Sequence, residues 1–540
     1  MLLVYRDVVQ EVSTRERFSR IRDRIAVGDA VGALIIAGEI EQGVIDAIDT
    51  WQDDWTDVHA NLRMLVQTAA AVARGHATAR DLFGVADAAL ATHLPATISC
   101  RAPEGYCHYA LDPLGYARAA ATYAADGRRC ALAIGVRSIG TSLAAVVADV
   151  LKAPSITVRA RGESGARRVI ASRQLRRHAV DQLSGGGDVA IVDEGPGATG
   201  ETFEVVAHWC RELGVADDRI VLFASHAGNS RLAPHRRQQW LESAIRYTPP
   251  AGDRGRAAAE AAGFDCAVSI SAGQWRQHVA SGHRLPAVCN FERTKYLARR
   301  NGQWWQIRYA GAGEWGDSII ARTCSLAERS CVSRAKPLKH GFIAQPWVDG
   351  APLTRRSLQS MDASRAARYL TARHALFPTG APVARERFIA ILSEHGAEAG
   401  ISAGAIAAAA RRIESLPERQ AFICDARLAP QEWIRTPTCL WKVDAVDHGD
   451  GFRLPGPTDA MWDFAGWLVE FEAPLSAFDD ALPGMTAEDR HAAAAYAPVY
   501  AAVAFGDLLL SAREAADPQD RRKLLREARV YRAAMRRWLR

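Results

Sequence analysis

Hydrophobic positions change their spacing about one hundred residues into the chain. Before that point alanine, leucine and valine recur every three or four positions, as in GDAVGALIIAGEIEQGVIDAI and NLRMLVQTAAAVARG. This spacing is typical of helices that bury one face. It predicts an all-helical opening region over residues 1–99.

Short apolar runs begin after residue 100 and alternate with amphipathic segments. The runs CALAIGV, SITVRAR, DVAIVDEG and DRIVLFAS predict strands within 130–136, 155–161, 188–195 and 218–225. The segments AAVVADVLKA and TFEVVAHWCRELG, which lie between them, have helical spacing. Alternating strands and helices predict a mainly parallel sheet that helices cover on both faces.

The pattern changes again near residue 286. KYLARRNGQWWQIRYAGAGEWG predicts a hairpin followed by a glycine turn, whereas SRAARYLTARHAL and AGAIAAAARRIESL predict helices. We therefore expect an α/β and α+β protein of several domains. Its parts are a helical N-terminal region (1–99), a parallel-sheet domain (100–285) and a C-terminal domain (286–540).

Composition narrows the class of protein. The hydrophobic fraction of 49%, the charged fraction of 24% and the net charge of +6 are ordinary for a soluble protein of 540 residues and do not favour nucleic acid. Runs long enough to cross a membrane are not apparent, and Arg6 and Asp7 interrupt the first apolar run. The cysteines lack CxxC spacing. We expect a cytoplasmic protein with reduced thiols and no membrane partner.

The basic segment 521–540 has one apolar stripe. Leu524, Ala528, Tyr531, Met535 and Trp538 follow one another at spacings of four and three. The stripe is expected to pack against the protein itself or against a second subunit, so a homodimer is one of two alternatives. A role of this basic helix at an RNA or a membrane surface would need more than one such helix.

Candidate chemistry begins with VAIVDEGPGATGETFEVV, residues 189–206. Two acids end an apolar strand and precede a glycine-rich turn and a helix start. Backbone N–H groups of such a turn bind phosphate, and adjacent carboxylates bind sugar hydroxyls or hydrated Mg²⁺. A ligand with a phosphate and a ribose diol would use both features. The alternative is an ordinary turn with Glu194 in solvent.

This stretch resembles the phosphoribosyl-diphosphate signature of type I phosphoribosyltransferases, which is four apolar residues, two acids, a short loop and Thr-Gly-x-Thr. The resemblance implies phosphoribosyl diphosphate as donor substrate, Mg²⁺ as cofactor, and Asp193 and Glu194 as the catalytic pair that holds the ribose hydroxyls. The loop here is one residue longer than in the family, and Pro196 replaces an apolar residue. The residues implied to bind the 5′-phosphate are Ala198, Thr199, Gly200, Glu201 and Thr202.

An upstream loop, VRSIGTS, lies between the first predicted strand and a helix. In the resembled family a loop in this place contacts the diphosphate. The basic segment TVRARGESGARRVI closes over that ligand or is a solvated run of charge, and RAPEGYCHYALDP lines the acceptor pocket or serves only packing. The residues implied to contact the diphosphate are Arg137, Ser138, Gly140, Thr141 and Ser142.

A second candidate site lies in the C-terminal half. AFICDARLAPQEWI and LWKVDAVDHGDGFRLPGPTDAMWDFAGWLVEF place Asp425 and Asp444 after apolar runs, with Asp463 downstream. This order resembles aminoglycoside-phosphotransferase and choline-kinase-like small-molecule kinases, which have two lobes. The resemblance implies that Asp425 orients the acceptor hydroxyl, that Asp444 binds the metal ion of ATP and that Asp463 anchors a helix. It makes 341–353 the hinge and 307–316 part of the nucleotide-binding lobe.

Two departures from the kinase pattern affect this interpretation. The asparagine expected after Asp425 is absent, and Glu432 is the nearby candidate metal ligand. The phosphate-pairing lysine is not evident, and Arg308 stands in its place as the candidate nucleotide-binding residue. His448 and Asp450 either reach the same metal ion or form a polar turn.

The sequence thus predicts a cytoplasmic enzyme with two sites. One is a phosphoribosyltransferase with an unknown acceptor, and the other is an ATP-dependent small-molecule kinase-like domain. The alternative is a regulatory protein that binds phosphoribosyl diphosphate or a nucleotide without turnover.

Overall fold

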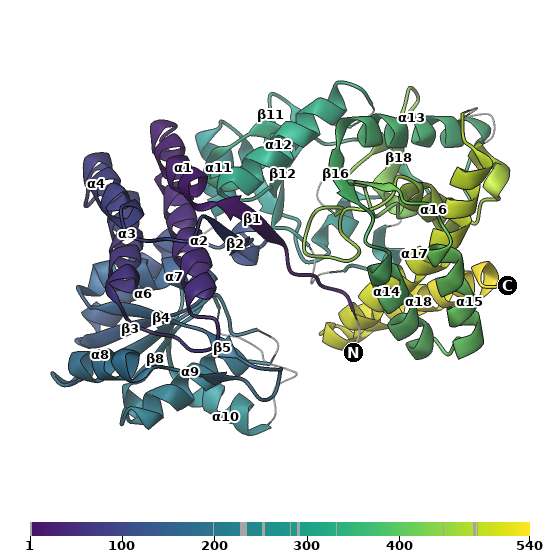
Figure 1. Ribbon diagram of the computed structural model, residues 1–540. Helices are drawn as coiled ribbons and strands as arrows, with labels where there is room; N and C mark the ends of the chain where they lie inside the picture. Colours follow the sequence, from purple (N-terminus) through teal and green to yellow (C-terminus); the bar gives the residue numbers. More distant parts are fainter. Residues whose placement is uncertain are drawn as a thin grey trace. The chain divides into compact units, whose positions relative to one another are not determined.

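The computed structural model describes residues 3–197, 199–226, 235–250, 254–280, 282–288, 292–330, 332–445, 448–478, 482 and 484–540. It divides into two compact units (Figure 1). The N-terminal unit comprises Val9–Arg254 and Gly311–Gly316, and the C-terminal unit comprises Met1–Val8, Gly255–Ala310 and Asp317–Arg540. Each unit is described by itself.

A five-stranded parallel sheet forms the centre of the N-terminal unit. Its strand order is β4-β3-β7-β8-β9, and every neighbouring pair is parallel. The expected parallel sheet is therefore present, although the last strand falls in a polar segment that gave no strand signal. The strands are β3 (Cys130–Val136), β4 (Ser155–Val158), β7 (Asp188–Val192), β8 (Ile220–Phe223) and β9 (Ile245–Tyr247).

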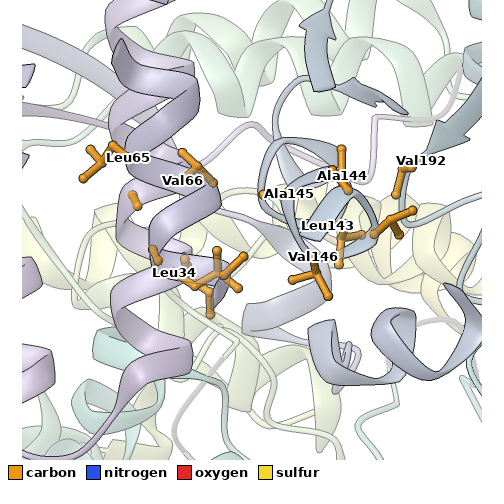
Figure 2. Packing of buried hydrophobic residues seen from close by; sticks show 14 of the residues in the cluster. Leu34, Leu65, Val66, Leu143, Ala144, Ala145, Val146 and Val192 are labelled. Atoms are coloured by element: carbon orange, nitrogen blue, oxygen red, sulfur yellow. The ribbon is translucent and has the colours of Figure 1, made fainter. Parts of the chain in front are cut away.

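Helices cover both faces of this sheet. Successive residues of β7 point to opposite faces, because Ala190 and Val192 belong to one hydrophobic cluster and Val189 and Ile191 to another. Figure 2 shows the first cluster, in which Val192 lies with residues of three helices. The helices of that face are α6 (Pro113–Ala125) and α7 (Ile139–Leu151), and those of the other face are α8 (Arg173–Leu183) and α9 (Glu201–Glu212).

The N-terminal helices share the first of these clusters. Leu34 and Leu65, for example, are buried with Leu143 of α7 (Figure 2). The expectation of an all-helical opening is wrong at its two ends, where β1 (Val9–Ser13) pairs antiparallel with β2 (Thr97–Arg101). The helices of this region are α1 (Thr14–Ala26), α2 (Ala30–Ile48), α3 (Asp57–Ala73) and α4 (Ala79–Leu90).

Smaller elements complete the N-terminal unit and lead into the next. A two-stranded antiparallel ribbon of β5 and β6 precedes α8. These elements are α5 (Glu104–Cys107), β5 (Ala160–Arg161), β6 (Arg168–Val169), α10 (His235–Ser243), α11 (Arg254–Ala261) and α12 (Gly313–Ala327).

A five-stranded antiparallel sheet lies in the C-terminal unit, in the order β10-β11-β12-β14-β13. The predicted hairpin is confirmed as β11 and β12, which are joined by Asn301 and Gly302 with φ of 52° and 78°. Asn-Gly favours this turn because both residues tolerate positive φ. The strands are β10 (Asp265–Ser269), β11 (Lys295–Arg300), β12 (Gln303–Tyr309), β13 (Lys336–Pro337) and β14 (Phe342–Pro346).

Helices and short ribbons form the remainder of the C-terminal unit. The helices are α13 (Ser360–Leu376), α14 (Arg385–Glu398), α15 (Ala403–Glu414), α16 (Met461–Glu470), α17 (Ala487–Glu514) and α18 (Pro518–Trp538). The ribbons are β15 (Ala351–Pro352) with β18 (Trp433–Arg435) and β19 (Leu440–Lys442), and β16 (Pro378–Pro382) with β17 (Gln420–Phe422).

The apolar stripe of α18 packs inside its own unit. Leu524, Ala528, Tyr531 and Met535 are buried in a cluster that also contains α17 residues. Figure 1 shows α17 and α18 side by side. Of the two alternatives for the stripe, packing within the chain is therefore the one that the structure supports.

Helix α17 is an exception to the expectation that the chain lacks apolar runs of membrane-spanning length. By length and composition it could cross a membrane, since an 18-residue window has a mean hydropathy of 1.5. In the structure 72% of that window is buried. The helix therefore has the character of a core helix of a soluble protein, which passes the same test.

Five of the cysteines that the structure describes are buried free thiols. Burial raises the pKa of Cys100, Cys130 and Cys210 to about 12, so these side chains are not reactive thiolates. Cys439 is disulfide-bonded, and the expectation of reduced thiols throughout is wrong at that residue.

Two helical glycines give a test of the packing of α7 against the sheet. A methyl group at Gly140 would lie 2.5 Å from the carbonyl oxygen of Val192, whereas nothing lies within 4 Å of one at the exposed Gly84. We expect Gly140→Ala to lower the free energy of unfolding by about 1–3 kcal/mol through overpacking. Gly84→Ala should raise it by up to about 1 kcal/mol. Chemical denaturation of both variants measures this, and equal effects would contradict the close approach.

Candidate active sites

The two loops predicted in the N-terminal unit lie together. The sheet reverses its strand order between β3 and β7, and loops that follow neighbouring strands at such a point form a crevice. A methyl group at Gly140 would also be 3.5 Å from Asp193 Oδ1. Ser138 precedes α7, and Thr141 and Ser142 are buried in its first turn. The structure thus brings residues 138–142 next to the acidic pair.

Asp193 and Glu194 directly follow β7. Burial raises the pKa of Asp193 to about 7 and that of Glu194 to about 8, and the charges of Asp193 and Glu104 add to the second shift. In the part of the chain that the structure describes, neither carboxylate has an ion-pair partner. Carboxylates in this condition fit Mg²⁺ or sugar hydroxyls, either of which would offset their repulsion.

The segment 101–113 borders these acids. A methyl group at Gly105 would lie 2.6 Å from the Glu194 carboxylate. Tyr106 and Ser142 share a hydrogen bond of 2.8 Å, and the Tyr116 hydroxyl donates to the Asp193 carbonyl at 2.8 Å. The segment therefore packs closely on the candidate site, and its role in lining an acceptor pocket stays a prediction.

The predicted phosphate loop leads into α9. Gly200 has a φ of 63°, and Glu201 is the first helical residue. Its carboxylate accepts a hydrogen bond of 2.6 Å from Gly165 N–H, which ties the basic segment to the start of α9. The backbone carbonyl of Thr199 accepts a hydrogen bond from Arg237. The side chain of Thr202 is half-buried. Ala198 lies outside the described residues.

Arg137 is part of a buried ionic network. Its guanidinium pairs with Asp53 and, at 3.3 Å, with Asp46. Arg159 Nε donates to Asp46 at 2.8 Å, and Arg161 pairs with Asp53 at 2.8 Å. These aspartates belong to α2 and the loop after it, and the sequence gave no signal for them. Arg137, Arg159 and Arg161 are thus paired with carboxylates of the same unit, whereas Arg167 and Arg168 of the basic segment are exposed.

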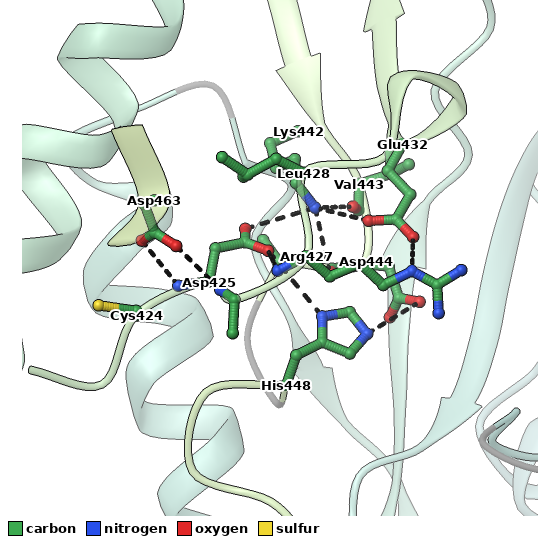
Figure 3. A network of polar contacts seen from close by, with 12 residues as sticks. Cys424, Asp425, Arg427, Leu428, Glu432, Lys442, Val443, Asp444, His448 and Asp463 are labelled. Carbon is green, nitrogen blue, oxygen red and sulfur yellow. Dashed lines mark hydrogen bonds and ion pairs between the residues drawn. The ribbon is translucent and has the colours of Figure 1, made fainter. Parts of the chain in front are cut away.

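In the C-terminal unit, Asp463 holds the loop that carries Asp425. Its two carboxylate oxygens accept the backbone N–H groups of Asp425 and Ala426, each at 2.9 Å (Figure 3). The hydroxyl of Tyr369 donates a hydrogen bond to the buried carboxylate of Asp425. The resemblance implies that Asp463 anchors a helix. In the structure Asp463 lies in α16 and also holds the loop that carries Asp425.

A lysine that the sequence analysis did not single out lies at the centre of this site. Lys442 Nζ is 3.3 Å from Asp425 Oδ2 and 3.0 Å from Glu432 Oε2, and its side chain is fully buried. Although burial opposes the charge on Asp425, Lys442 holds the pKa of that carboxyl below its usual range. The other oxygen of Glu432 pairs with Arg427 Nε at 2.8 Å.

Asp444 meets three basic side chains. Arg308 Nη1, Lys295 Nζ and His448 Nε2 lie 3.6, 3.8 and 4.0 Å from its carboxylate oxygens. His448 Nδ1 also lies 3.9 Å from Asp425, so the imidazole stands between the two aspartates (Figure 3). Arg308 is thus at the site as predicted, whereas Lys295 was missed.

Backbone strain is concentrated beside the same residues. Ala426 and Asp444 have φ of 62° and 55°, a region that costs a residue with a side chain about 1 kcal/mol or more. Such strain is common at functional sites, where the surrounding structure over-determines the backbone.

The residues of this site do not fit the Mg²⁺ ion that the kinase resemblance implies. Each of Asp425, Glu432 and Asp444 faces at least one basic group of the chain, and both oxygens of Glu432 are engaged. The neighbouring trio His374, Cys424 and Asp463 could hold a metal ion by distance, but both oxygens of Asp463 already accept backbone N–H groups.

Two hollows adjoin these elements. A cavity of about 290 Å³ has Ala426, Arg427 and His448 in its lining, together with Tyr500 and Tyr531. A second, of about 480 Å³, is lined partly by the predicted hinge, with Trp347, Val348 and Asp349, and by Trp441.

Comparison with known proteins adds the following. No family model and no curated protein matches the chain. Choline kinase LicA from Streptococcus pneumoniae is 14% identical over 44% of this chain and 89% of its own, with a TM-score of 0.33. Ethanolamine kinase from Plasmodium vivax is 11% identical over 45% of this chain and 81% of its own, with a TM-score of 0.32. Spectinomycin phosphotransferase APH(9)-Ia, solved with ADP and spectinomycin, is 11% identical over 45% of this chain and 89% of its own, with a TM-score of 0.32.

The chain is thus similar to small-molecule kinases over less than half of its length. At such identities and TM-scores, the likeness assigns no family, ligand or activity. None of these three structures is a phosphoribosyltransferase, and that part of the interpretation stays a prediction.

The acidic pair gives a pH prediction. Unfolded carboxyls ionise near pH 4, whereas those of Asp193 and Glu194 keep their protons up to about pH 7 and 8 in the folded unit. Their contribution to stability is therefore fully present at low pH and is lost as the pH rises through these values. We expect the unfolding temperature to fall between pH 5 and 9. In the Asp193→Asn, Glu194→Gln double variant this fall should be smaller, and an unchanged slope would contradict the raised pKa values.

Proposed function

We propose that the C-terminal unit binds a nucleotide and transfers its terminal phosphoryl group to a hydroxyl of a small molecule. The observation that carries this proposal is the placing of Asp425. Asp463 and Tyr369 fix it, and the loop that it begins lines a cavity large enough for a small acceptor.

The side chains suit such a transfer by position and charge. Asp425, with its lowered pKa, accepts the hydrogen bond of an incoming hydroxyl and so orients the oxygen for attack. Arg308 and Lys295 beside Asp444 offer positive charge to the transferred phosphoryl group. Positioning and charge stabilisation are the main contributions that this kind of reaction requires of a protein.

ADP release from ATP tests this proposal in the presence of a panel of small hydroxyl compounds. We expect Asp425→Asn to lower kcat by about 10²-fold or more, because an amide does not accept the hydroxyl proton's hydrogen bond as a carboxylate does. Glu398→Gln serves as the matched control, since that acid is partly exposed and pairs only with Arg513 at the surface. Turnover that is unchanged in Asp425→Asn would remove this residue from the reaction.

We infer further that the N-terminal unit binds phosphoribosyl diphosphate. Support comes from the two loops that meet at the point where the sheet reverses, and from Asp193 and Glu194, whose carboxylates form no ion pair with the described residues. These acids would hold the ribose hydroxyls or a Mg²⁺ ion, which when bound would neutralise charge on the departing diphosphate. The reaction is displacement of diphosphate at the anomeric carbon by an acceptor whose identity is open.

Diphosphate release from phosphoribosyl diphosphate with a panel of bases tests this second site. The Asp193→Asn, Glu194→Gln variant should lose at least about 10²-fold in rate, whereas Asp181→Asn, at an exposed position of α8, should not change it. Release that persists in the double variant would exclude the acidic pair.

Binding without turnover is the second candidate function for both units. It is favoured by Lys442, which lies between Asp425 and Glu432, and by the pairing of Arg137 with Asp53. Ligand binding without ADP or diphosphate release would support it. A cytoplasmic location and self-association stay predictions.

A further inference from the structure

The ammonium group of Lys442 occupies a cage of four oxygens. Besides Asp425 and Glu432, the carbonyl oxygens of Val443 and Asp444 lie 3.0 and 3.4 Å from Nζ. Mg²⁺ binds oxygen at about 2.0–2.1 Å, so these separations are those of an ammonium group donating hydrogen bonds. The cation that these four oxygens surround is therefore the ammonium group of Lys442, which is part of the chain itself.

Among the residues that the structure describes, the ion-paired charges around this cage are also balanced. The acids are Asp425, Glu432, Asp444 and Glu292, the last being 3.7 Å from Lys295. Against these four stand four cations, which are Lys442, Arg427, Lys295 and Arg308. A site that waits for divalent ions would instead hold an excess of carboxylates.

We propose that Lys442 is the resident cation of this site and that the site binds the phosphate chain of a nucleotide without a divalent metal ion. The inference rests on the proposed nucleotide site and states how its ligand is held. Lys442 keeps Asp425 and Glu432 neutralised, so the cations left to meet the anion are Arg308 and Lys295, beside Asp444, and Arg427, in the lining of the cavity of about 290 Å³.

Displacement of Lys442 by a metal ion is disfavoured for a physical reason. The side chain is buried, and an ammonium group that loses its carboxylates without reaching water is strongly destabilising. Although burial lowers the pKa of a lysine, Asp425 and Glu432 together raise that of Lys442, so it stays charged.

Titration of ATP into the full-length protein tests the inference. Binding is measured by calorimetry in excess EDTA and again in excess MgCl₂, with the Asp193→Asn, Glu194→Gln variant used to exclude binding at the N-terminal site. We expect dissociation constants that agree within about threefold. Binding with Mg²⁺ that weakens tenfold or more in EDTA would overturn this inference and leave the nucleotide site standing. No binding in either buffer would overturn both.

A lysine variant gives a second, independent readout. Lys442→Met removes the internal cation and leaves a pair of carboxylates, so we expect this variant to bind one more Mn²⁺ per chain than the wild type, as counted by electron paramagnetic resonance. Lys336→Met, at an exposed position of β13, should bind the same number as the wild type. An unchanged count in a folded Lys442→Met protein would contradict the cage. If that variant does not fold, the calorimetry of the wild type decides.

Discussion

The carboxylate of Asp463 determines the form of the C-terminal site. It accepts two successive backbone N–H groups, so the peptide units at Asp425 and Ala426 have a fixed orientation. That orientation turns Asp425 toward Lys442 and Tyr369 and forces Ala426 into positive φ. A buried carboxylate is stable only when its hydrogen bonds are made, and here the loop supplies them. The same two hydrogen bonds therefore position the site and satisfy the buried carboxylate of α16.

In each unit a candidate basic residue pairs with carboxylates of the same unit. In one, Arg137 pairs with Asp53, and in the other, Lys442 pairs with Asp425 and Glu432. Such pairs contribute little net stability after desolvation, but they fix side-chain positions. An anion at Arg137 would have to compete with Asp53, whereas the proposed nucleotide would leave Lys442 with its carboxylates.

The sequence was informative where local pattern decides structure. The apolar runs located four of the five parallel strands, and Asn301-Gly302 placed the hairpin. That two-residue turn also sets the register, with Lys295 opposite Arg308, so the missed lysine could have been found by counting back from the turn. Lys442 had a weaker signal, a single charge inside the apolar run LWKV.

Other features could not be read from local pattern. Asp46 and Asp53 are ordinary polar positions until the fold brings them to Arg137, which is a long-range contact. Strand β9 is short and lies in a polar segment, and β1 shows little burial to mark it as a strand. Because neither strand buries one full face, hydrophobic and polar residues do not alternate clearly along it.

The pairing of Asp46 and Asp53 with Arg137, Arg159 and Arg161 has a consequence for synthesis. The ribosome makes Asp46 of α2 and Asp53 after it well before the arginines, so both aspartates lack these partners until the chain has been synthesised past β3 and β4. The opening helices consequently have no complete set of partners until the edge of the parallel sheet exists. The ion pairs that join the opening region to the sheet can therefore form only after the first two strands of that sheet have been synthesised.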